Sequence, residues 1–348
     1  MGLRSRPMRP KDVAECARIV AAHPVIGPRY GSAIADLRPA WLRLLSCEAK
    51  CAMVLEEVNR SHATICFVGV SIFVGDNFIR EIKNPLRWLG PELARGMMRG
   101  DLPLLSGRQL REANSRGGLN LIVWEGCIRP EFEQHAEVHR RLLKLFIEEH
   151  CGYLWKEVIA SQMESLERLQ WTLQTGGLLW SPARGRYVES LDKDPREILE
   201  EPHLIGVTRE IERGRPGTWV GALFDYHPPQ LSFSPSEQQL LLSALSDRTD
   251  EELSDELGTS LSTVKNTWRS VYNRAASRLP GLFPDHARAD LGLSQRGKEK
   301  RRFLMAYLRE HPEELRPVSR KLPQQGAART AFLDQAEKWG QLPVSPKR

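Results

Sequence analysis

Three side chains that can bind a base edge or a phosphate lie close together in the segment STVKNTWRSVYNR. Lys265 and Arg269 are four residues apart, and Asn266 is adjacent to Lys265. On a helix this spacing places both cations on one side. Arginine and lysine donate to O6 and N7 of guanine, and asparagine can pair with the edge of adenine. The segment therefore has the chemistry of a surface that reads the major groove of DNA.

The apolar residues of the same segment indicate a helix with one buried side. Four of them recur at i, i+4, i+7 and i+11 and are expected to face a core: Val264, Trp268, Val271 and Ala275. Lys265, Asn266 and Arg269 then project away from that core, and Asn273 lies on the same flank. We expect this outward side to carry the function.

Two further helices are expected upstream of the cationic one. Ser234 precedes a proline and stands three residues before Glu237, which is the pattern of a capping box with proline at the first helical position. Thr249 and Glu252 repeat the box. The sequence from about residue 230 to 279 thus predicts helices only.

Gly258 separates the second helix from the third. Glycine adopts the left-handed conformation that ends a helix, and Ser260 can cap the next one, so we expect a helix-turn-helix. The positive terminus from Ser260 to Thr263 suits a phosphate oxygen. Residues 236–257 hold seven acidic and one basic side chain, whereas 258–284 hold four basic and no acidic ones. A charged helix face usually means only exposure, but the caps, the glycine and this boundary together favour recognition of DNA.

Residues 233–275, FSPSEQQLLLSALSDRTDEELSDELGTSLSTVKNTWRSVYNRA, resemble the LuxR/FixJ-type helix-turn-helix of bacterial transcription regulators. The likeness runs without a gap from the Ser-Pro-x-Glu opening to the Val-Tyr pair near the end of the third helix. It implies that Lys265, Asn266 and Arg269 face the major groove and that Thr263 lies near the DNA backbone. The expected partner is double-stranded DNA.

Some positions depart from that family's pattern. Ser254 stands where the family usually has alanine, Thr259 where it has isoleucine, and Ala275 where it has leucine. The family's dimerising fourth helix should follow, but Pro280 and Pro284 interrupt that region. We expect a homodimer, with its mode of pairing left open.

A basic amphipathic helix is expected near residues 297–310. Its apolar face holds four residues: Phe303, Leu304, Tyr307 and Leu308. Three interpretations stay open for this helix: packing against the DNA-binding helices, a dimer contact, or extra phosphate contacts through its lysines and arginines. Packing is the default.

The first 226 residues alternate strand-like and helix-like stretches, which predicts an α/β domain around one sheet. Strands are expected at 52–58, 64–74, 119–127, 153–160 and 178–180, and helices at 10–22, 138–150 and 164–174. This order, together with the RPMRPKDVAECARIV opening, resembles a GNAT-type N-acetyltransferase. That family holds the acyl-CoA pyrophosphate on a glycine-containing loop after its fourth strand.

The corresponding stretch here, 128–143, contains no glycine, which backbone needs for close approach to a phosphate. We therefore expect a domain that senses a small molecule or a partner, with no bound cofactor and no catalytic residues. The alternative is an acyl-CoA-dependent N-acetyltransferase fused to the helix-turn-helix. A protein-binding adaptor is a third interpretation.

Weaker constellations have ordinary explanations. His135 and His139 have the i, i+4 spacing of a zinc pair but no third ligand at a fixed spacing, so no metal site is expected. Cys47 and Cys51 are interpreted as packed thiols. Glu125 could serve as a general base in a GNAT-like position, although a solvated carboxylate at a strand end is the preferred interpretation.

Aromatic residues are concentrated in the same domain. Seven of the nine tryptophans precede residue 226, and filling the core is a better explanation for them than lining a ligand pocket. The NSRGGLN segment, 114–120, is expected to form a turn that could rim such a pocket.

Length and composition set the remaining expectations. A chain of 348 residues with 41% hydrophobic and 27% charged side chains is typical of a globular protein with two domains. We expect an α/β domain at 1–226, an all-α helix-turn-helix domain at 227–290, and a basic helix with a loose tail at 291–348. Six cysteines without a CxxC pair, and a start without an apolar leader, favour the cytoplasm and no membrane contact. The net charge of +6 mildly favours an anionic partner.

Overall fold

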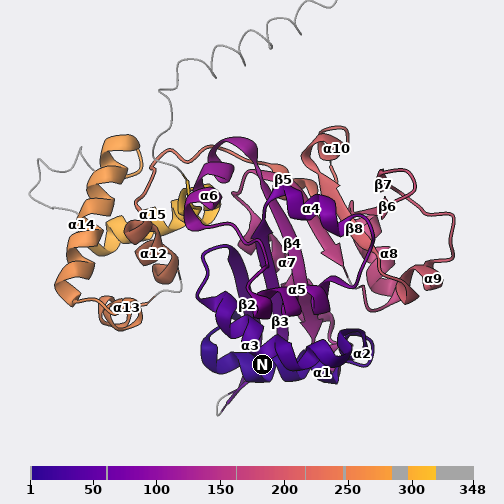
Figure 1. Cartoon of the computed structure of the whole chain (residues 1–348). Coiled ribbons are helices and arrows are strands. Elements are labelled where there is room, and N and C mark those ends of the chain that lie inside the picture. The colour runs from indigo at the N-terminus through magenta and orange to yellow at the C-terminus, as the bar shows by residue number, and fades with distance from the viewer. Residues whose placement is uncertain are drawn as a thin grey trace, which may run out of the picture. The chain divides into compact units, whose positions relative to one another are not determined.

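The computed structural model describes residues 2–59, 62–161, 163–215, 217–245, 248–283 and 297–318. A mixed α/β arrangement occupies the chain up to Phe224, and the described residues from Pro235 onward are helical (Figure 1). The expected combination of a mixed sheet and helices is confirmed at this level.

The described residues contain one eight-stranded sheet in the order β1-β2-β3-β4-β5-β8-β6-β7. Its strands are β1 (Gly2–Pro7), β2 (Lys50–Val58), β3 (Ala63–Val74), β4 (Leu119–Ile128), β5 (Trp155–Ser161), β6 (Leu178–Ser181), β7 (Arg186–Val188) and β8 (Leu204–Thr208). Neighbouring strands are antiparallel except β4 and β5, which run parallel. A parallel pair needs a crossover, and helix α7 (Ala136–His150) supplies it.

The other helices of the α/β part are short to medium in length. They are α1 (Val13–Ala22), α2 (Ile26–Tyr30), α3 (Ile34–Leu45), α4 (Asp76–Ile82), α5 (Leu89–Arg99), α6 (Gly107–Glu112), α8 (Leu166–Gln174), α9 (Pro195–Glu200), α10 (Arg209–Arg213) and α11 (Gly221–Phe224). The 3₁₀ turns η1 (Pro10–Asp12), η2 (Gly31–Ala33) and η4 (Pro130–Phe132) and the π-helical turn η3 (Ala113–Gly117) connect them.

Helices cover both faces of the sheet. Val70 and Ile72 of β3 belong to a buried cluster with Trp41 of α3 and Leu93 of α5. Phe73, the next residue of β3, belongs to a second cluster that includes side chains of α7. This alternation follows from the period of two along a strand, and it explains why the long apolar run of β3 is buried on both sides.

β4 carries a β-bulge that affects the face on which its polar residues lie. Val70 of β3 pairs with Glu125, whereas the next residue, Ser71, pairs with Val123, so Trp124 is the extra residue. A bulge breaks the strict alternation of faces. As a result Glu125 shares the face that α1, α2 and α3 cover, beside Trp124.

The helical part contains α12 (Pro235–Ala244), α13 (Asp250–Leu257), α14 (Leu261–Arg278), α15 (Gly297–Glu310) and the 3₁₀ turn η6 (Pro312–Leu315). All four helices contribute to one apolar cluster, which includes Leu240, Leu253, Val271 and Leu304. The expected helices between 230 and 279 and near 297–310 are confirmed.

Several elements are not anticipated by the sequence patterns. The basic opening of the chain is the edge strand β1, and β8 inserts between β5 and β6 although it is later in the chain than both. α3 holds Pro39 in its interior, where a proline argues against a helix, although its buried residues keep the helical spacing: Leu37, Ala40, Trp41 and Leu44. Pro284, which was expected to interrupt a fourth helix, and the expected loose tail beyond residue 318 lie outside the described residues.

Candidate functional site

The turn between α13 and α14 is built as the glycine predicts. Gly258 has φ of 58° and ends α13 in the left-handed conformation. The N–H of Thr259 donates to the carbonyl of Ser254 over 3.0 Å. Ser260 then caps α14, its hydroxyl accepting the N–H of Thr263. Two helices are thus joined by a turn of only three residues, 258–260.

The inner side of α14 is buried as expected. Val264, Val271 and Ala275 are at most 1% exposed, and Trp268 is 5% exposed. The indole Nε1 of Trp268 donates to Asp250 at the start of α13, over 3.1 Å. This side chain therefore fixes the angle between the two helices as well as filling the core.

The outer side of α14 carries the residues that the sequence singled out. We call this surface the cationic face: Thr263, Lys265, Asn266, Arg269 and Asn273, all of which are exposed. Within the described part of the chain, the side chains of Lys265, Asn266, Arg269 and Asn273 form no ion pair or hydrogen bond. The Thr263 hydroxyl lies 2.8 Å from that of Ser260.

Arg274, on the same helix, is neutralised by a carboxylate, unlike Lys265 and Arg269 in the described part of the chain. Its guanidinium pairs with Glu237 of α12 over 3.2 Å, and Ser270 donates to the same carboxylate. Burial alone would raise the pKa of Glu237, but its hydrogen bonds from Ser234 and Ser270 and the charge of Arg274 lower that pKa. Glu237 therefore stays ionised and holds Arg274 against α12, whereas Lys265 and Arg269 have no such partner among the described residues.

Helix α15 packs against this group of helices, in agreement with the default interpretation. Leu304, Met305 and Leu308 are buried in the same cluster as α14. Arg301 lies 4.7 Å from the ring of Trp268 and pairs with Asp250 over 3.0 Å. One of the basic side chains considered for phosphate contact is therefore engaged within the protein.

The preferred interpretation of Glu125 as a solvated strand-end carboxylate is wrong. Glu125 is 4% exposed, and β4 continues three residues beyond it. The bulge at Trp124 turns it to the covered face, where the hydroxyl of Tyr30 donates to it over 2.8 Å. Burial raises the pKa of Glu125 to about 7, and nearby Glu164 adds to the effect.

The seven tryptophans before residue 226 divide between core and surface: three are buried, Trp88, Trp180 and Trp219 are half-buried, and Trp171 is 42% exposed. Trp41, Trp124 and Trp155 are at most 1% exposed. Trp180 lines a cavity of about 580 Å³, between the loop at 84–86 and the segment 181–203. The expected core filling therefore holds for Trp41, Trp124 and Trp155 and not for the other four.

Asn114 does not rim either cavity described in this section. It is fully buried, and its amide oxygen accepts the N–H of Leu154 over 2.7 Å. Its amide nitrogen donates to the carbonyl of Pro317. The segment does form a turn before β4, but Asn114 is a structural residue.

The two pairs that were considered as metal ligands, His135 with His139 and Cys47 with Cys51, do not form a metal-binding group among the described residues. His135 and His139 are exposed, and His139 hydrogen-bonds the carbonyl of Glu133. Cys47 and Cys51 are half-buried free thiols. In the described ranges no group of three or more histidine, cysteine or carboxylate side chains is arranged to hold a metal ion.

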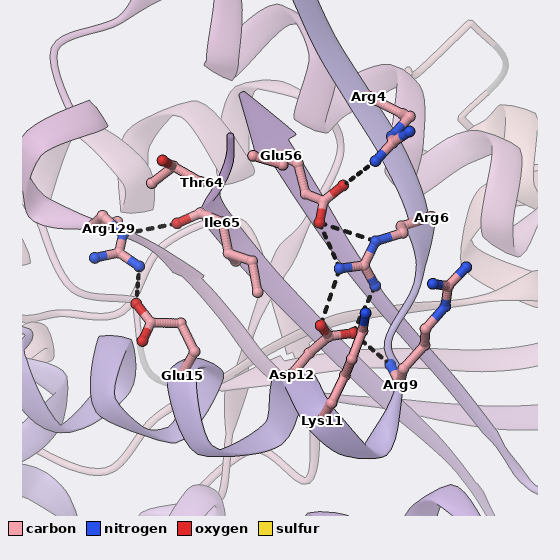
Figure 2. A pocket seen from close by; sticks show the side chains of 11 residues that line it. Arg4, Arg6, Arg9, Lys11, Asp12, Glu15, Glu56, Thr64, Ile65 and Arg129 are labelled. Carbon is pink, nitrogen blue, oxygen red and sulfur yellow. Dashed lines mark hydrogen bonds and ion pairs between the residues drawn. The ribbon is translucent and has the colours of Figure 1, made fainter. Parts of the chain in front are cut away.

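A second charged site lies where the sequence analysis proposed nothing. We call it the arginine cavity: about 540 Å³ between β1, the start of α1, β2 and the start of β3 (Figure 2). Its cations are Arg4, Arg6, Arg9, Lys11 and Arg129, and its carboxylates are Asp12, Glu15 and Glu56. The sequence did contain one indication of this site: Arg4 and Arg6 are two residues apart, and in a strand that spacing places both side chains on one face.

Arg6 is the centre of the arginine cavity. Its two terminal nitrogens donate to the two oxygens of Asp12 over 2.6 and 3.0 Å, and its Nε donates to Glu56 over 3.0 Å. Arg4, directly opposite Glu56 in the sheet, donates to the other oxygen of that carboxylate. Burial alone would raise the pKa of Asp12 and of Glu56, but these bonds lower both.

Comparisons with known proteins add little. No protein-family model and no curated protein matches the chain. Among solved structures, the chain is similar to an uncharacterized protein from Bacillus halodurans, with 11% identity and a TM-score of 0.34, over 65% of this chain and 92% of that one. A likeness at that score supports no assignment.

Membrane insertion through a helix has no support in the described part of the chain. None of the helices there combines the length and the apolar composition that crossing a bilayer requires.

Proposed function

We propose that the protein is a sequence-specific DNA-binding transcription regulator that inserts α14 into the major groove. One observation carries the proposal: Lys265, Asn266, Arg269 and Asn273 of the cationic face are exposed and form no ion pair or hydrogen bond among the described residues, while the other side of the helix is packed. Lys265, Asn266 and Arg269 lie in the N-terminal half of α14, which is the half that contacts base edges in helix-turn-helix proteins. The capped terminus at Ser260 and Thr263 suits a phosphate.

The local structure supports the resemblance to LuxR/FixJ-type regulators. The left-handed glycine, the two capping boxes and the buried inner side of α14 are the features on which that resemblance rests. The positions that depart from the family's pattern are also accommodated. The hydroxyl of Ser254 donates to the carbonyl of Thr259. Two of the residues that differ from the family's pattern therefore stabilise the turn through a hydrogen bond to each other.

The amino-terminal part is proposed to be the sensor. The parallel pairing of β4 with β5 and the return of β8 between β5 and β6 support a GNAT-like arrangement. Residues 128–143 include the 3₁₀ turn η4 and the first half of α7, and His135 at the start of α7 provides no capping side chain. Without a glycine there, this helix start is a poor pyrophosphate cradle, so ligand sensing is favoured over catalysis. The regulator is proposed to act as a homodimer on two half-sites.

The proposal is tested by selecting bound duplexes from a random DNA pool with the purified full chain. We expect enrichment of a defined sequence, in two halves if the protein acts as a dimer. Affinity for that sequence should fall steeply as salt rises, because neutralising phosphates releases counterions. Absence of enrichment, or a complex insensitive to salt, would contradict the proposal.

A second candidate, the acyl-CoA-dependent N-acetyltransferase, is favoured by Glu125. A carboxyl with a pKa of about 7, held by Tyr30, is suited to general base catalysis near neutral pH. Against it, Glu125 lines neither of the two cavities described. Acetyl-CoA should therefore neither raise the melting temperature nor be consumed in the presence of amines. Binding with turnover that the Glu125→Gln variant loses would favour the enzyme instead.

A further inference from the structure

The arginine cavity has more positive than negative charge. Five cations and three carboxylates line it, an excess of two positive charges. Each carboxylate already has a partner: Arg6 holds Asp12, Arg4 and Arg6 hold Glu56, and Arg129 pairs with Glu15. The internal pairs therefore leave cations over, and no carboxylate of the cavity is available for them.

The unpaired cations are Arg9 and Lys11. Both are exposed, and in the described chain neither side chain forms an ion pair or a hydrogen bond. Figure 2 shows the Arg9 guanidinium directed away from the three carboxylates. Arg129 stands at the other end of the cavity, where its Nε donates to the carbonyl of Ile65 over 2.7 Å. It is about one-fifth exposed, so it can still contact a ligand.

The backbone that carries Arg9 and Lys11 is held in place. Asp12 accepts the N–H of Arg9 over 2.8 Å, and Pro10 between the two cations restricts the chain further. Asp12 is itself fixed by both terminal nitrogens of Arg6, which is only 13% exposed. Isolated surface cations are normally just solvated. Arg9 and Lys11, however, lie at the rim of a cavity on a backbone that Asp12 and Pro10 hold in place. Binding a ligand therefore costs less conformational entropy than it would on a mobile loop.

The chemistry of the lining restricts the ligand. A lining of ion pairs disfavours an apolar ligand, and a cavity of about 540 Å³ has room for a small molecule only. Two excess positive charges match a dianion. A phosphate monoester is close to dianionic at neutral pH, and guanidinium groups bind its oxygens through paired hydrogen bonds. Thr64 adds a hydroxyl to the lining.

We propose that the arginine cavity is a binding site for a small phosphate monoester whose phosphate group is held by Arg9 and Lys11. The phosphate group itself supplies the recognition, so inorganic phosphate is a sufficient probe. In the regulator proposed above, this site would receive the signal; that role rests on the proposed function, whereas binding of the phosphate does not.

Isothermal titration of the full chain with inorganic phosphate, at constant ionic strength and without DNA, tests the site. We expect saturable binding that weakens about tenfold or more in Arg9→Ala/Lys11→Ala. The control Arg38→Ala/Lys144→Ala removes the same charges from exposed positions that do not line the cavity and should bind like the wild type. Both double variants replace exposed side chains, and their melting temperatures without phosphate check that they fold.

Three results would overturn the inference: no saturable binding by the wild type, equal weakening in both double variants, or equally tight binding of succinate, which would remove the preference for phosphate. DNA selection on the same protein separates the two proposals. Phosphate binding without any selected sequence would refute the regulator and leave the site, and a selected sequence without phosphate binding would do the reverse.

Discussion

The cationic face of α14 and the arginine cavity both display positive charge, but they use it differently. On α14, Lys265 and Arg269 are exposed and have no carboxylate partner in the described chain. In the cavity, Arg6 is 13% exposed and bonds to two carboxylates. The first surface is convex and follows a helix, whereas the second is concave and is built across three strands and a helix start.

The difference shows which charges are available to a partner. An exposed, unpaired cation contributes little to folding stability, so it is free to form a favourable interaction with a ligand. A buried cation between carboxylates is required by the fold, because removing it leaves uncompensated charges. Arg6 should therefore control stability, Arg269 should control binding, and substitutions can test this division.

Arg6→Ala is expected to have the largest effect. It leaves Asp12 and Glu56 buried without their main partner, which should cost about 3 to 5 kcal/mol of unfolding free energy. Urea denaturation measures the change. Arg38→Ala, at an exposed position, should stay within about 0.5 kcal/mol of the wild type. Replacing both carboxylates as well, in Arg6→Ala/Asp12→Asn/Glu56→Gln, should recover part of the loss. A loss below about 1 kcal/mol for Arg6→Ala would show that the ion pairs do not support the fold.

Glu125→Gln tests a buried carboxyl that, unlike Asp12, forms no ion pair within the described residues. Its folded pKa, about 7, lies above its ordinary value of 4.5, so the folded state holds the proton more tightly than the unfolded state does. Stability should therefore fall as pH rises from about 4.5 through 7. Glutamine keeps an acceptor for Tyr30 without the charge, and the variant should gain up to about 3 kcal/mol over the wild type at pH 8.

Denaturation at pH 5, 6, 7 and 8 measures the effect of Glu125→Gln. The difference between variant and wild type should grow across this range. Glu137→Gln, at an exposed position on α7, should leave the pH dependence unchanged. A constant difference at all four values would mean that Glu125 does not titrate between 5 and 8.

Arg269→Ala should weaken binding without affecting folding. Loss of one contact to a base should reduce affinity for the selected duplex by about 1 to 3 kcal/mol, with a smaller loss on random DNA. Fluorescence anisotropy on both duplexes gives the two values. Arg278→Ala, which removes an exposed arginine near the end of the same helix but outside the cationic face, is the matched control. Equal losses on selected and random DNA would assign Arg269 to the phosphates.

The two regions also differ in how far the sequence predicts them. Val264 and Trp268 reveal the buried side of α14, and Gly258 its beginning, because a helix and its caps are determined by residues close in the chain. The arginine cavity depends on pairing of Arg4 with Glu56, which are 52 residues apart. Single-sequence patterns do not contain such a pairing. Glu125 was misplaced for a similar reason, since the bulge at Trp124 arises from pairing with β3.

Gly258→Ala should have the smallest effect and tests whether the turn positions the cationic face. An added methyl group has free space around it, so the cost comes from the left-handed backbone alone, about 1 kcal/mol of unfolding free energy. Gly258→Asn should cost less, because asparagine tolerates that conformation better. If the turn sets the angle of α14 in the groove, Gly258→Ala should also reduce the affinity for DNA, because the strained turn would shift the helix. Gly258→Asn should keep that affinity. A normal affinity for alanine alongside the loss of stability would mean that α14 is positioned by its packing through Trp268 and not by the turn.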